Sequence, residues 1–430
     1  MVEWSITTDC KSVALRASLV QIQPDAPKCY NCNKKNMAVT TDENKIKNLL
    51  TRGVEEVYVR EDLEAELKTG NVLRIKLGID PTGAKIHLGR AVIIRKLREF
   101  QKMGHQIVLI VGDFTAQVGD ASDKTEKRPM LTRMQIDENL KDYKNQLGKI
   151  LDLEKTEIVY NNDWLGKLTF GELTKLAEVF TVQQMLARRN FKDRYENEVE
   201  ISLREFLYPI MQGYDSVAVK ADVELGGFDQ LFNLKAGRDI QNYYGMKKQN
   251  ILLGEMLEGT DGRKMSTSWG NMITIVDEPN DMFQKLMSVK DELIAKYFKL
   301  CTDRELEEIE GYKKRIEDGE NPRDIKIILA TDIVTLYHNE KLAAQAKQNF
   351  IEVFQNGGVP DDIGEVIGDE TSLVADLILK AGLVTSKAEW KRLVEQNGVS
   401  VDEAVITDYK ILARNGIYKI GKKKFIRVRV

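Results

Sequence analysis

The stretch that decides the fold is KLGIDPTGAKIHLGR, residues 76–90. An apolar run over residues 72–79 predicts a buried strand, and the DPTG sequence that follows breaks it. A long helical pattern begins after His87. The stretch therefore predicts a strand, a turn and a helix N-terminus, where backbone N–H groups and the partial positive charge of the helix favour phosphate.

The next apolar run, QIVLIV at residues 106–111, predicts a second strand that is buried on both faces, as in parallel sheets. Strand, helix and strand form a right-handed βαβ unit, so we expect an α/β fold with a Rossmann-type, doubly wound parallel sheet. Ligands of such sheets lie beyond the carboxyl ends of the strands. The polar residues expected at those ends are Asp80, His87, Asp113, Thr115 and Asp120.

Composition excludes several classes of protein. The chain has 430 residues, enough for two or three domains, with 42% hydrophobic and 30% charged residues. That balance is typical of a soluble cytosolic protein, and the sequence lacks the long apolar run of a membrane span. A net charge of −3 excludes a uniformly basic nucleic-acid binder, so any RNA contact must use local basic patches.

The N-terminal residues differ from the rest. Residues 1–36 hold three of the four cysteines and no clear helical period, and their single Cys-x-x-Cys pair does not predict a zinc site. We interpret them as disordered or as a misassigned start, with Met37 as the initiator. Residues 42–70 predict two short amphipathic helices. The apolar faces of these helices would carry Leu49, Leu50, Val54, Leu63 and Leu67.

A second polar constellation lies in EFLYPIMQGYDS. Tyr208, Gln212 and Asp215 have the spacing i, i+4, i+7, which places them on one helical face. Pro209 disfavours the helical conformation at Tyr208, so we expect the helix to begin or kink there. Such a face could also be a buried polar stripe. A short strand then ends in GGFDQ at residues 226–230, where two glycines permit close approach and a carboxylate suits a ribose diol.

The third motif is GRKMSTSWGN, residues 262–271, a polar loop with one lysine and three hydroxyl groups. Alone it could be a surface loop. Together with His87-x-Gly89, however, Lys264-Met265-Ser266 resembles the two signatures of class I aminoacyl-tRNA synthetases. Arg90 stands where a second histidine is usual, and Thr267 where a second lysine is usual.

Over residues 42–430 the motifs resemble, in their order, those of bacterial tyrosyl-tRNA synthetases. The resemblance implies that His87, Thr82 and Lys264 are catalytic through the ATP phosphates. It implies that ATP is bound by Asp80, Gly89, Arg90, Gly227, Asp229, Lys264, Met265, Ser266, Thr267 and Ser268. It implies that tyrosine is bound by Lys76, Asp120, Tyr208, Gln212, Asp215 and Gln230.

Individual roles follow from the same resemblance. Asp229 would hold the ribose, and Asp215 would take the phenol hydroxyl. The amino and carboxyl end of tyrosine would be held by Asp120, Tyr208, Gln212 and Gln230. Lys76 stands where many family members carry a tyrosine that also touches the phenol, so recognition of the hydroxyl is expected to depend mainly on Asp215. The implied partners are L-tyrosine, tRNA(Tyr) and a second copy of the chain, in the cytoplasm.

The implied chemistry needs no protein nucleophile. The tyrosine carboxylate attacks the α-phosphate of ATP, pyrophosphate leaves, and the adenylate passes tyrosine to the 3′ end of tRNA. Catalysis would then consist of positioning and of charge stabilisation of the phosphates. Mg²⁺ would arrive with ATP, and we expect no dedicated metal site in the protein.

The C-terminal half has a different pattern. Helical patterns over residues 279–300, 302–316 and 324–354 predict an α-helical domain, to which the resemblance assigns the anticodon arm. Residues 357–370 are interpreted as a linker. Residues 371–430 resemble an S4-type RNA-binding module. Its last strand would bind tRNA phosphates through Lys422, Lys423, Lys424, Arg427 and Arg429. The alternative is a solvated edge strand that carries protective charge.

The expected organisation is therefore an N-terminal extension (1–36), a Rossmann-type catalytic domain (37–275), an α-helical anticodon-arm domain (276–360) and a small α+β S4-like domain (371–430). Two other functions are compatible with parts of this pattern: a tryptophan-type synthetase or small-molecule adenylyltransferase, and a non-catalytic RNA-binding relative. Asp215 favours a phenol over an indole, and the presence of every site motif argues against loss of catalysis.

Overall fold

The computed structural model describes residues 38–81, 83, 85–120, 131–265, 269–355, 364–369, 371–402, 404–421 and 424–430. The predicted extension at residues 1–36 lies outside them. The chain divides into two compact units, Met1–Met256 and Leu257–Val430. No helix of the described ranges is long and apolar enough to cross a membrane.

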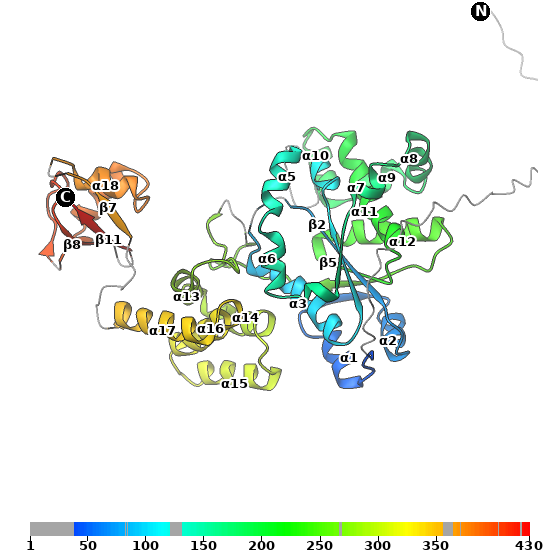
Figure 1. Cartoon of the computed structure of the whole chain (residues 1–430), viewed down its shortest axis with the longest axis horizontal. Coiled ribbons are helices and arrows are strands. Elements are labelled where there is room, and N and C mark those ends of the chain that lie inside the picture. Colours follow the sequence, from blue (N-terminus) through cyan, green and yellow to red (C-terminus); the bar gives the residue numbers. More distant parts are fainter. Residues whose placement is uncertain are drawn as a thin grey trace, which may run out of the picture. The chain divides into compact units, whose positions relative to one another are not determined.

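The first unit is built on a six-stranded sheet with the strand order β1-β6-β5-β2-β3-β4. The strands are β1 (Val54–Tyr58), β2 (Arg74–Ile79), β3 (Gln106–Val111), β4 (Thr156–Tyr160), β5 (Val223–Gly227) and β6 (Asn250–Gly254). All neighbours pair in parallel except β1, which runs antiparallel to β6. The predicted doubly wound α/β sheet is thus confirmed, with one antiparallel edge strand. Figure 1 shows β2 and β5 in the middle of this unit, with helices around them.

Helices connect and cover these strands. They are α1 (Glu43–Leu49), α2 (Arg60–Lys68), α3 (Leu88–Lys102), α4 (Thr115–Val118), α5 (Arg133–Leu140), α6 (Tyr143–Gly148), α7 (Asn162–Leu165), α8 (Phe170–Ala177), α9 (Val182–Leu186), α10 (Arg189–Glu196), α11 (Leu203–Ala218) and α12 (Leu231–Tyr243). The crossover helix α3 buries Leu88, Ala91, Ile94, Leu97 and Phe100. It ends before Gly104, whose φ of +94° is the left-handed conformation that favours glycine after a helix.

The register of the strands places their carboxyl ends at one edge. Ile79 pairs with Val111, and Val111 pairs with Tyr160. The polar residues that follow, Asp80, Asp113 and Asn161, therefore leave the sheet at the same level. This edge is where the sequence predicts the ligand site.

The two short helices predicted over residues 42–70 are confirmed as α1 and α2, but three local details in this unit are wrong. Val54 belongs to β1 between the two helices, because Val54–Tyr58 pairs with β6 and tertiary pairing overrides a helix-like spacing. The strand predicted from Val72 begins at Arg74, since Val72 is exposed. Helix α11 begins well before Tyr208, because Ser202 and Glu205 form a capping box, and Pro209 lies inside the helix.

The second unit begins with helices. They are α13 (Pro279–Met287), α14 (Ile294–Cys301), α15 (Leu306–Glu317), α16 (Pro322–Tyr337) and α17 (Glu340–Gln355). The single helix expected over residues 324–354 is therefore two. The break lies at His338, and the side chain of Asn339 then accepts a hydrogen bond from the N–H of Leu342 at 2.9 Å, as an N-cap does.

The last part of the chain forms a five-stranded sheet with the order β7-β11-β10-β8-β9. The elements are β7 (Glu365–Ile367), α18 (Val374–Lys380), α19 (Lys387–Glu395), β8 (Val399–Val401), β9 (Ala404–Val405), β10 (Gly416–Ile420) and β11 (Lys424–Arg429). Trp390, Tyr418 and Val428 lie in its core. Residues 365–367, predicted as linker, form β7, which pairs in parallel with β11. Because β11 lies between β7 and β10, the edge-strand alternative for it is wrong.

Candidate active site

Asp80, directly after β2, connects three elements of the first unit. Its Oδ2 accepts a hydrogen bond from the Tyr208 hydroxyl at 2.8 Å, and its Oδ1 accepts one from the Thr115 hydroxyl at 2.7 Å. A Cβ at Gly112 would lie 2.0 Å from Asp80 Oδ1, so the position requires glycine. The turn after β2 is thereby joined to α11 and α4.

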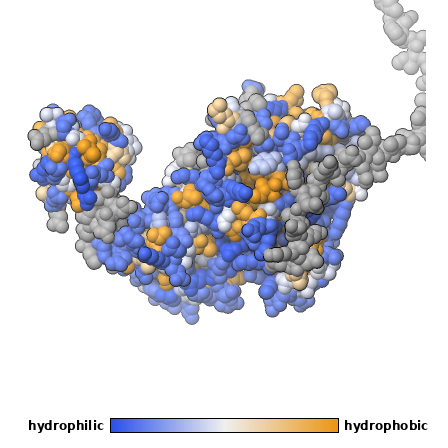
Figure 2. All heavy atoms as spheres, in the orientation of Figure 1, coloured by the Kyte–Doolittle hydropathy of each residue, from blue (hydrophilic) through white to orange (hydrophobic). Residues whose placement is uncertain are grey.

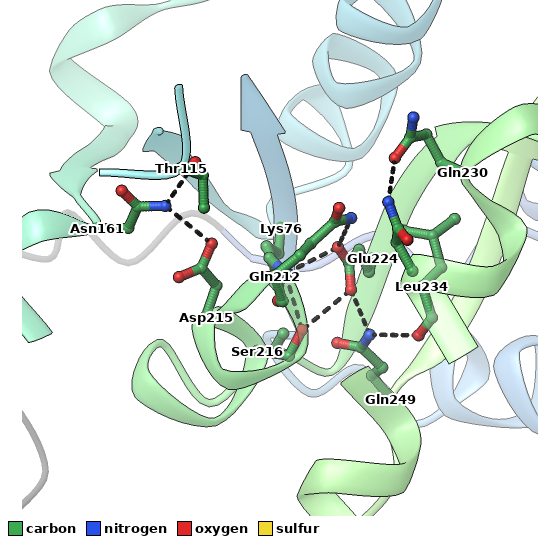
Figure 3. Close-up of polar contacts among 12 residues, drawn as sticks. Lys76, Thr115, Asn161, Gln212, Asp215, Ser216, Glu224, Gln230, Leu234 and Gln249 are labelled. Atoms are coloured by element: carbon green, nitrogen blue, oxygen red, sulfur yellow. Dashed lines mark hydrogen bonds and ion pairs between the residues drawn. The ribbon is translucent and has the colours of Figure 1, made fainter. Parts of the chain in front are cut away.

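Asp215, on α11, is almost completely buried. Its Oδ1 accepts a hydrogen bond from Trp164 Nε1 at 2.7 Å, and its Oδ2 accepts one from Asn161 Nδ2 at 3.3 Å. Burial raises the pKa of Asp215 to about 7, against the opposing effects of the Lys76 charge and the two hydrogen bonds. Figure 3 shows Asp215 facing Asn161, which also reaches Thr115. The predicted face of α11 thus meets the carboxyl ends of β3 and β4.

Lys76 lies in a buried polar network between β2, α11 and β5. Its Nζ donates to Glu224 Oε1 at 2.7 Å, to Ser216 Oγ at 2.8 Å and to the backbone oxygen of Gln212 at 3.1 Å. Both charged side chains are 1% exposed or less. Glu224 also accepts hydrogen bonds from the side chains of Gln212, Ser216 and Gln249 (Figure 3). The ammonium group is therefore directed at Glu224, and the network holds both the backbone and the side chain of Gln212.

Asp120 and Gln230 meet from opposite sides of the sheet centre. Gln230 Nε2 donates to Asp120 Oδ2 at 2.7 Å, and Gln230 Oε1 accepts from Asn233 Nδ2 at 3.0 Å. In the neighbouring turn, a Cβ at Gly227 would lie 2.6 Å from Asp229 Oδ1, which explains the second glycine of GGFDQ. Asp229 itself is exposed.

His87 is the N-cap residue of α3. Its Nδ1 accepts a hydrogen bond from the backbone N–H of Arg90 at 3.3 Å. In the neutral ring the proton then belongs to Nε2, which becomes a donor. Arg90 reaches the Tyr143 hydroxyl at 3.0 Å, and Gly89 lies in the same first turn. The helix start therefore presents one imidazole donor in addition to its backbone N–H groups.

The loop of Lys264 belongs to the second unit. Lys264 is exposed and Met265 is buried. Asn271 Nδ2 donates to the backbone oxygen of Lys264 at 3.2 Å and to Asp261 Oδ1 at 2.8 Å. The hydrogen bond from Asn271, together with those from Arg263, lowers the pKa of Asp261 to about 2. The base of the loop is thus fixed while the lysine side chain reaches solvent.

Several predicted residues lie outside the described part of the chain: Thr82, Ser266, Thr267, Ser268, Lys422 and Lys423. Of the remaining basic residues of β11, Lys424 donates to the backbone oxygen of Leu383, and Arg429 Nε lies 3.1 Å from Glu365 Oε2. Arg427 is half-buried.

Sequence reasoning missed the partners that hold this site. They are Asn161, Trp164, Ser216, Glu224 and Gln249. Asn161 directly follows a strand, a signal that could have placed it at the ligand edge. The other four have no local signal, because only the folded chain brings them to Lys76 and Asp215.

Comparison with known proteins gives one family. The model of the class I tRNA synthetases (W and Y) matches residues 68–355. The chain is 45% identical to the tyrosine–tRNA ligase of Thermotoga maritima over 90% of this chain and 98% of that one. It is 46% identical to that of Mannheimia succiniciproducens over 91% of this chain and 100% of the relative.

Solved structures agree at the level of the fold. A C-terminally truncated mitochondrial tyrosyl-tRNA synthetase of Aspergillus nidulans has a TM-score of 0.61 and 21% identity, covering 72% of this chain and 94% of that one. The tyrosyl-tRNA synthetase of Archaeoglobus fulgidus, solved with L-tyrosine, has a TM-score of 0.57 and 23% identity. The match covers 71% of this chain and 99% of that one. With identities near 45% over nine-tenths of its length, the chain belongs to the tyrosine–tRNA ligases, within the class I synthetases.

Proposed function

We propose that this protein activates L-tyrosine with ATP to tyrosyl-adenylate and pyrophosphate, and then transfers tyrosine to the 3′ end of tRNA(Tyr). The observation that carries the substrate assignment is Asp215. It is a buried carboxylate that two side-chain donors hold on the face of α11. A phenol hydroxyl can donate to such a group, whereas the ring of phenylalanine would leave it without that partner.

The amino and carboxyl end of tyrosine is assigned to Asp120, Tyr208, Gln212 and Gln230. Two pairs support this assignment: Tyr208 with Asp80, and Gln230 with Asp120. Lys76 acts through Gln212 in this proposal, because its ammonium group already donates to Glu224, Ser216 and a backbone oxygen. It positions the pocket and does not read the phenol.

The phosphates of ATP are assigned to the start of α3 and to the loop of Lys264. His87 Nε2 donates to phosphate oxygen as charge develops, Lys264 adds a mobile cation, and Asp229 accepts from the ribose hydroxyls. The carboxylate of tyrosine attacks the α-phosphorus in line, so the protein's part is to align two bound substrates and stabilise charge. Thr82, Ser266, Thr267 and Ser268 complete the phosphate set in this proposal.

Mg²⁺ belongs to the nucleotide in this mechanism. When bound with ATP it supplies positive charge to the phosphate oxygens, and it keeps several waters and phosphate ligands without a protein cage. The acidic residue that could be considered as a ligand of Mg²⁺ is Asp80, which already accepts hydrogen bonds from Tyr208 and Thr115. We therefore assign Asp80 to positioning the turn after β2.

The tRNA is assigned to the second unit. Helices α13–α17 take the anticodon arm, and the sheet with β11 contacts phosphates through Lys422, Lys423, Lys424, Arg427 and Arg429. We retain the boundaries 37–275, 276–360 and 371–430 for the three domains, with β7 added to the last. The protein acts in the cytoplasm, where tRNA and ribosomes meet.

A second copy of the chain is assigned to the apolar surface of the first unit. Four helices each expose one large apolar residue. They are Met134 of α5 (81% exposed), Phe170 of α8 (82%), Val182 of α9 (60%) and Leu203 of α11 (80%). Figure 2 shows hydrophobic patches that interrupt a mostly hydrophilic surface. Exposed apolar area of this kind favours association.

Pyrophosphate exchange with each of the twenty amino acids tests the activity. We expect ATP-dependent exchange with tyrosine alone, and charging of tRNA(Tyr) when tRNA is added. Exchange with tryptophan would contradict the substrate, and tRNA binding without any exchange would indicate a relative that has lost catalysis.

A further inference from the structure

Arg188 is a buried cation that the proposed mechanism does not use. It directly precedes α10, and its side chain is 4% exposed. The guanidinium carbon lies 4.8 Å from the ring centre of Phe191 and 4.9 Å from that of Phe232. Two aromatic rings therefore hold the group by cation–π contact and remove most of its water.

The guanidinium group donates no hydrogen bond to any residue that the structure describes. The carboxylate nearest to it is that of Asp120, whose Oδ1 lies 3.9 Å from Nη2, beyond hydrogen-bond length. Arg194, six positions along the chain, shows the contrast. It is also buried, but its two Nη groups donate to both oxygens of Glu205 and to the backbone oxygen of Glu200, and only its Nε has no partner among the described residues. Only 4% of its side chain is exposed, and a guanidinium group carries five N–H donors, so Arg188 is available to an acceptor that arrives later.

The surroundings indicate what that acceptor is. Burial lowers the pKa of Arg188, and the charges of Asp120, Tyr208 and Glu205 oppose that shift. An arginine guanidinium group is a cation at neutral pH. Asp120 and Tyr208 belong to the proposed tyrosine site, and Gln230 already holds the other oxygen of Asp120. An acid and a cation thus lie side by side without a hydrogen bond between them. Their opposite charges match the adjacent ammonium and carboxylate of an α-amino acid.

We propose that Arg188 is a substrate-binding residue that holds the carboxylate of the incoming tyrosine, while Asp120 holds its ammonium group. This inference uses the assignment of Asp120 in the proposed function. A guanidinium group binds a carboxylate through two parallel N–H donors, so it fixes the orientation of the group that must attack ATP. A charge-assisted hydrogen bond of this kind contributes on the order of a 10- to 100-fold gain in affinity.

The test compares a ligand that carries both ends of the zwitterion with one that carries only the ammonium end. Calorimetry of the full-length protein measures the affinities of L-tyrosine and of tyramine, which has the ammonium group but no carboxylate. Arg188→Gln is expected to weaken tyrosine about 10- to 100-fold and to leave tyramine nearly unchanged. Arg188→Lys keeps the charge and should recover part of the loss. The ratio of the two affinities is an internal control, because partial misfolding lowers the active fraction for both ligands alike.

Two further variants distinguish the role proposed for Arg188 from the assignment of Asp120 on which it rests. Asp120→Asn should lower the affinities for tyrosine and tyramine alike. If it does not, the assignment of Asp120 is wrong, and the ratio of the two affinities in Arg188→Gln still tests the role of Arg188. Arg194→Gln is the matched control: it removes a buried arginine whose two Nη groups already donate to Glu205 and Glu200, and it should not change the ratio. Equal losses for tyrosine and tyramine in Arg188→Gln would overturn the proposal and give Arg188 a structural role. An unchanged tyrosine affinity would overturn it as well.

Discussion

The two ends of the proposed site differ in how their charges are held. At the tyrosine end, Asp215 and Glu224 are 3% exposed or less, and each accepts hydrogen bonds from two or more side chains. Of the residues assigned to ATP, Asp229 in the first unit and Lys264 in the second are each exposed. A buried group with fixed partners discriminates strongly between ligands, because a wrong ligand leaves it unsatisfied. An exposed charge discriminates less, but an exposed lysine such as Lys264 can adjust its position to a phosphate.

The largest expected effect is at the buried end. Asp215→Ala should lower the preference for tyrosine over phenylalanine by orders of magnitude, measured as the ratio of kcat/KM in pyrophosphate exchange. Tyrosyl-tRNA synthetases are the established example of this discrimination, so the structure supplies the residue and not the magnitude. Asp222→Ala is the control, since Asp222 accepts from the N–H of Arg74 at the other end of β2. Unchanged discrimination in Asp215→Ala would mean that another residue reads the hydroxyl.

The buried ion pair gives the second prediction. Lys76→Met leaves Glu224 charged and unpaired, so the free energy of unfolding should fall by about 3–5 kcal/mol. Adding Glu224→Gln should recover much of that loss, because the amide keeps hydrogen-bonding capacity without the charge. Lys155→Met, which breaks an exposed pair with Asp152, should change stability by no more than about 1 kcal/mol. Urea unfolding measures all three, and a double variant no more stable than Lys76→Met would refute the pairing.

The exposed end gives a kinetic prediction of the opposite kind. His87→Ala and Lys264→Ala should each slow adenylate formation by on the order of 10²-fold with little change in tyrosine affinity, since their contacts strengthen in the transition state. Single-turnover kinetics and tyrosine titrations separate the two quantities. Arg263→Ala, at a neighbouring cation paired with Asp261, is the control. If tyrosine affinity falls as much as the rate, these residues are structural.

The smallest expected effect is in the C-terminal sheet. Arg427→Gln should flatten the salt dependence of tRNA binding by a slope of about one unit, the value for one phosphate contact. Arg429→Gln should change it less, because Glu365 already lies 3.1 Å from that guanidinium group. Lys387→Gln, at a lysine paired with Asp376, serves as the control for a general loss of charge. Tyrosine-dependent pyrophosphate exchange should be unaffected, and parallel salt slopes for Arg427→Gln would exclude a phosphate contact.

Local sequence patterns predicted the parts of this molecule that depend on local physics. Residues 106–111 form the expected strand, and Asp80 and His87 lie at the ligand edge, because apolar runs and strand–turn–helix signals act over a few residues. The strand β1 was missed because its partner β6 lies nearly two hundred positions away. Lys76 was read as a substrate contact, and its partner Glu224 could be found only from the fold. Whether each predicted site residue binds as assigned stays a prediction.

The network around Lys76 also limits how this pocket can change over generations. Lys76, Ser216, Glu224 and Gln249 are joined by hydrogen bonds, so a single substitution at any of them leaves a buried donor, acceptor or charge without its counterpart. Tolerated changes must therefore occur in compensating pairs, which are rarer than single steps. Single substitutions in this network are therefore expected to be tolerated rarely. A laboratory search for variants that accept a different amino acid should accordingly randomise these four positions together.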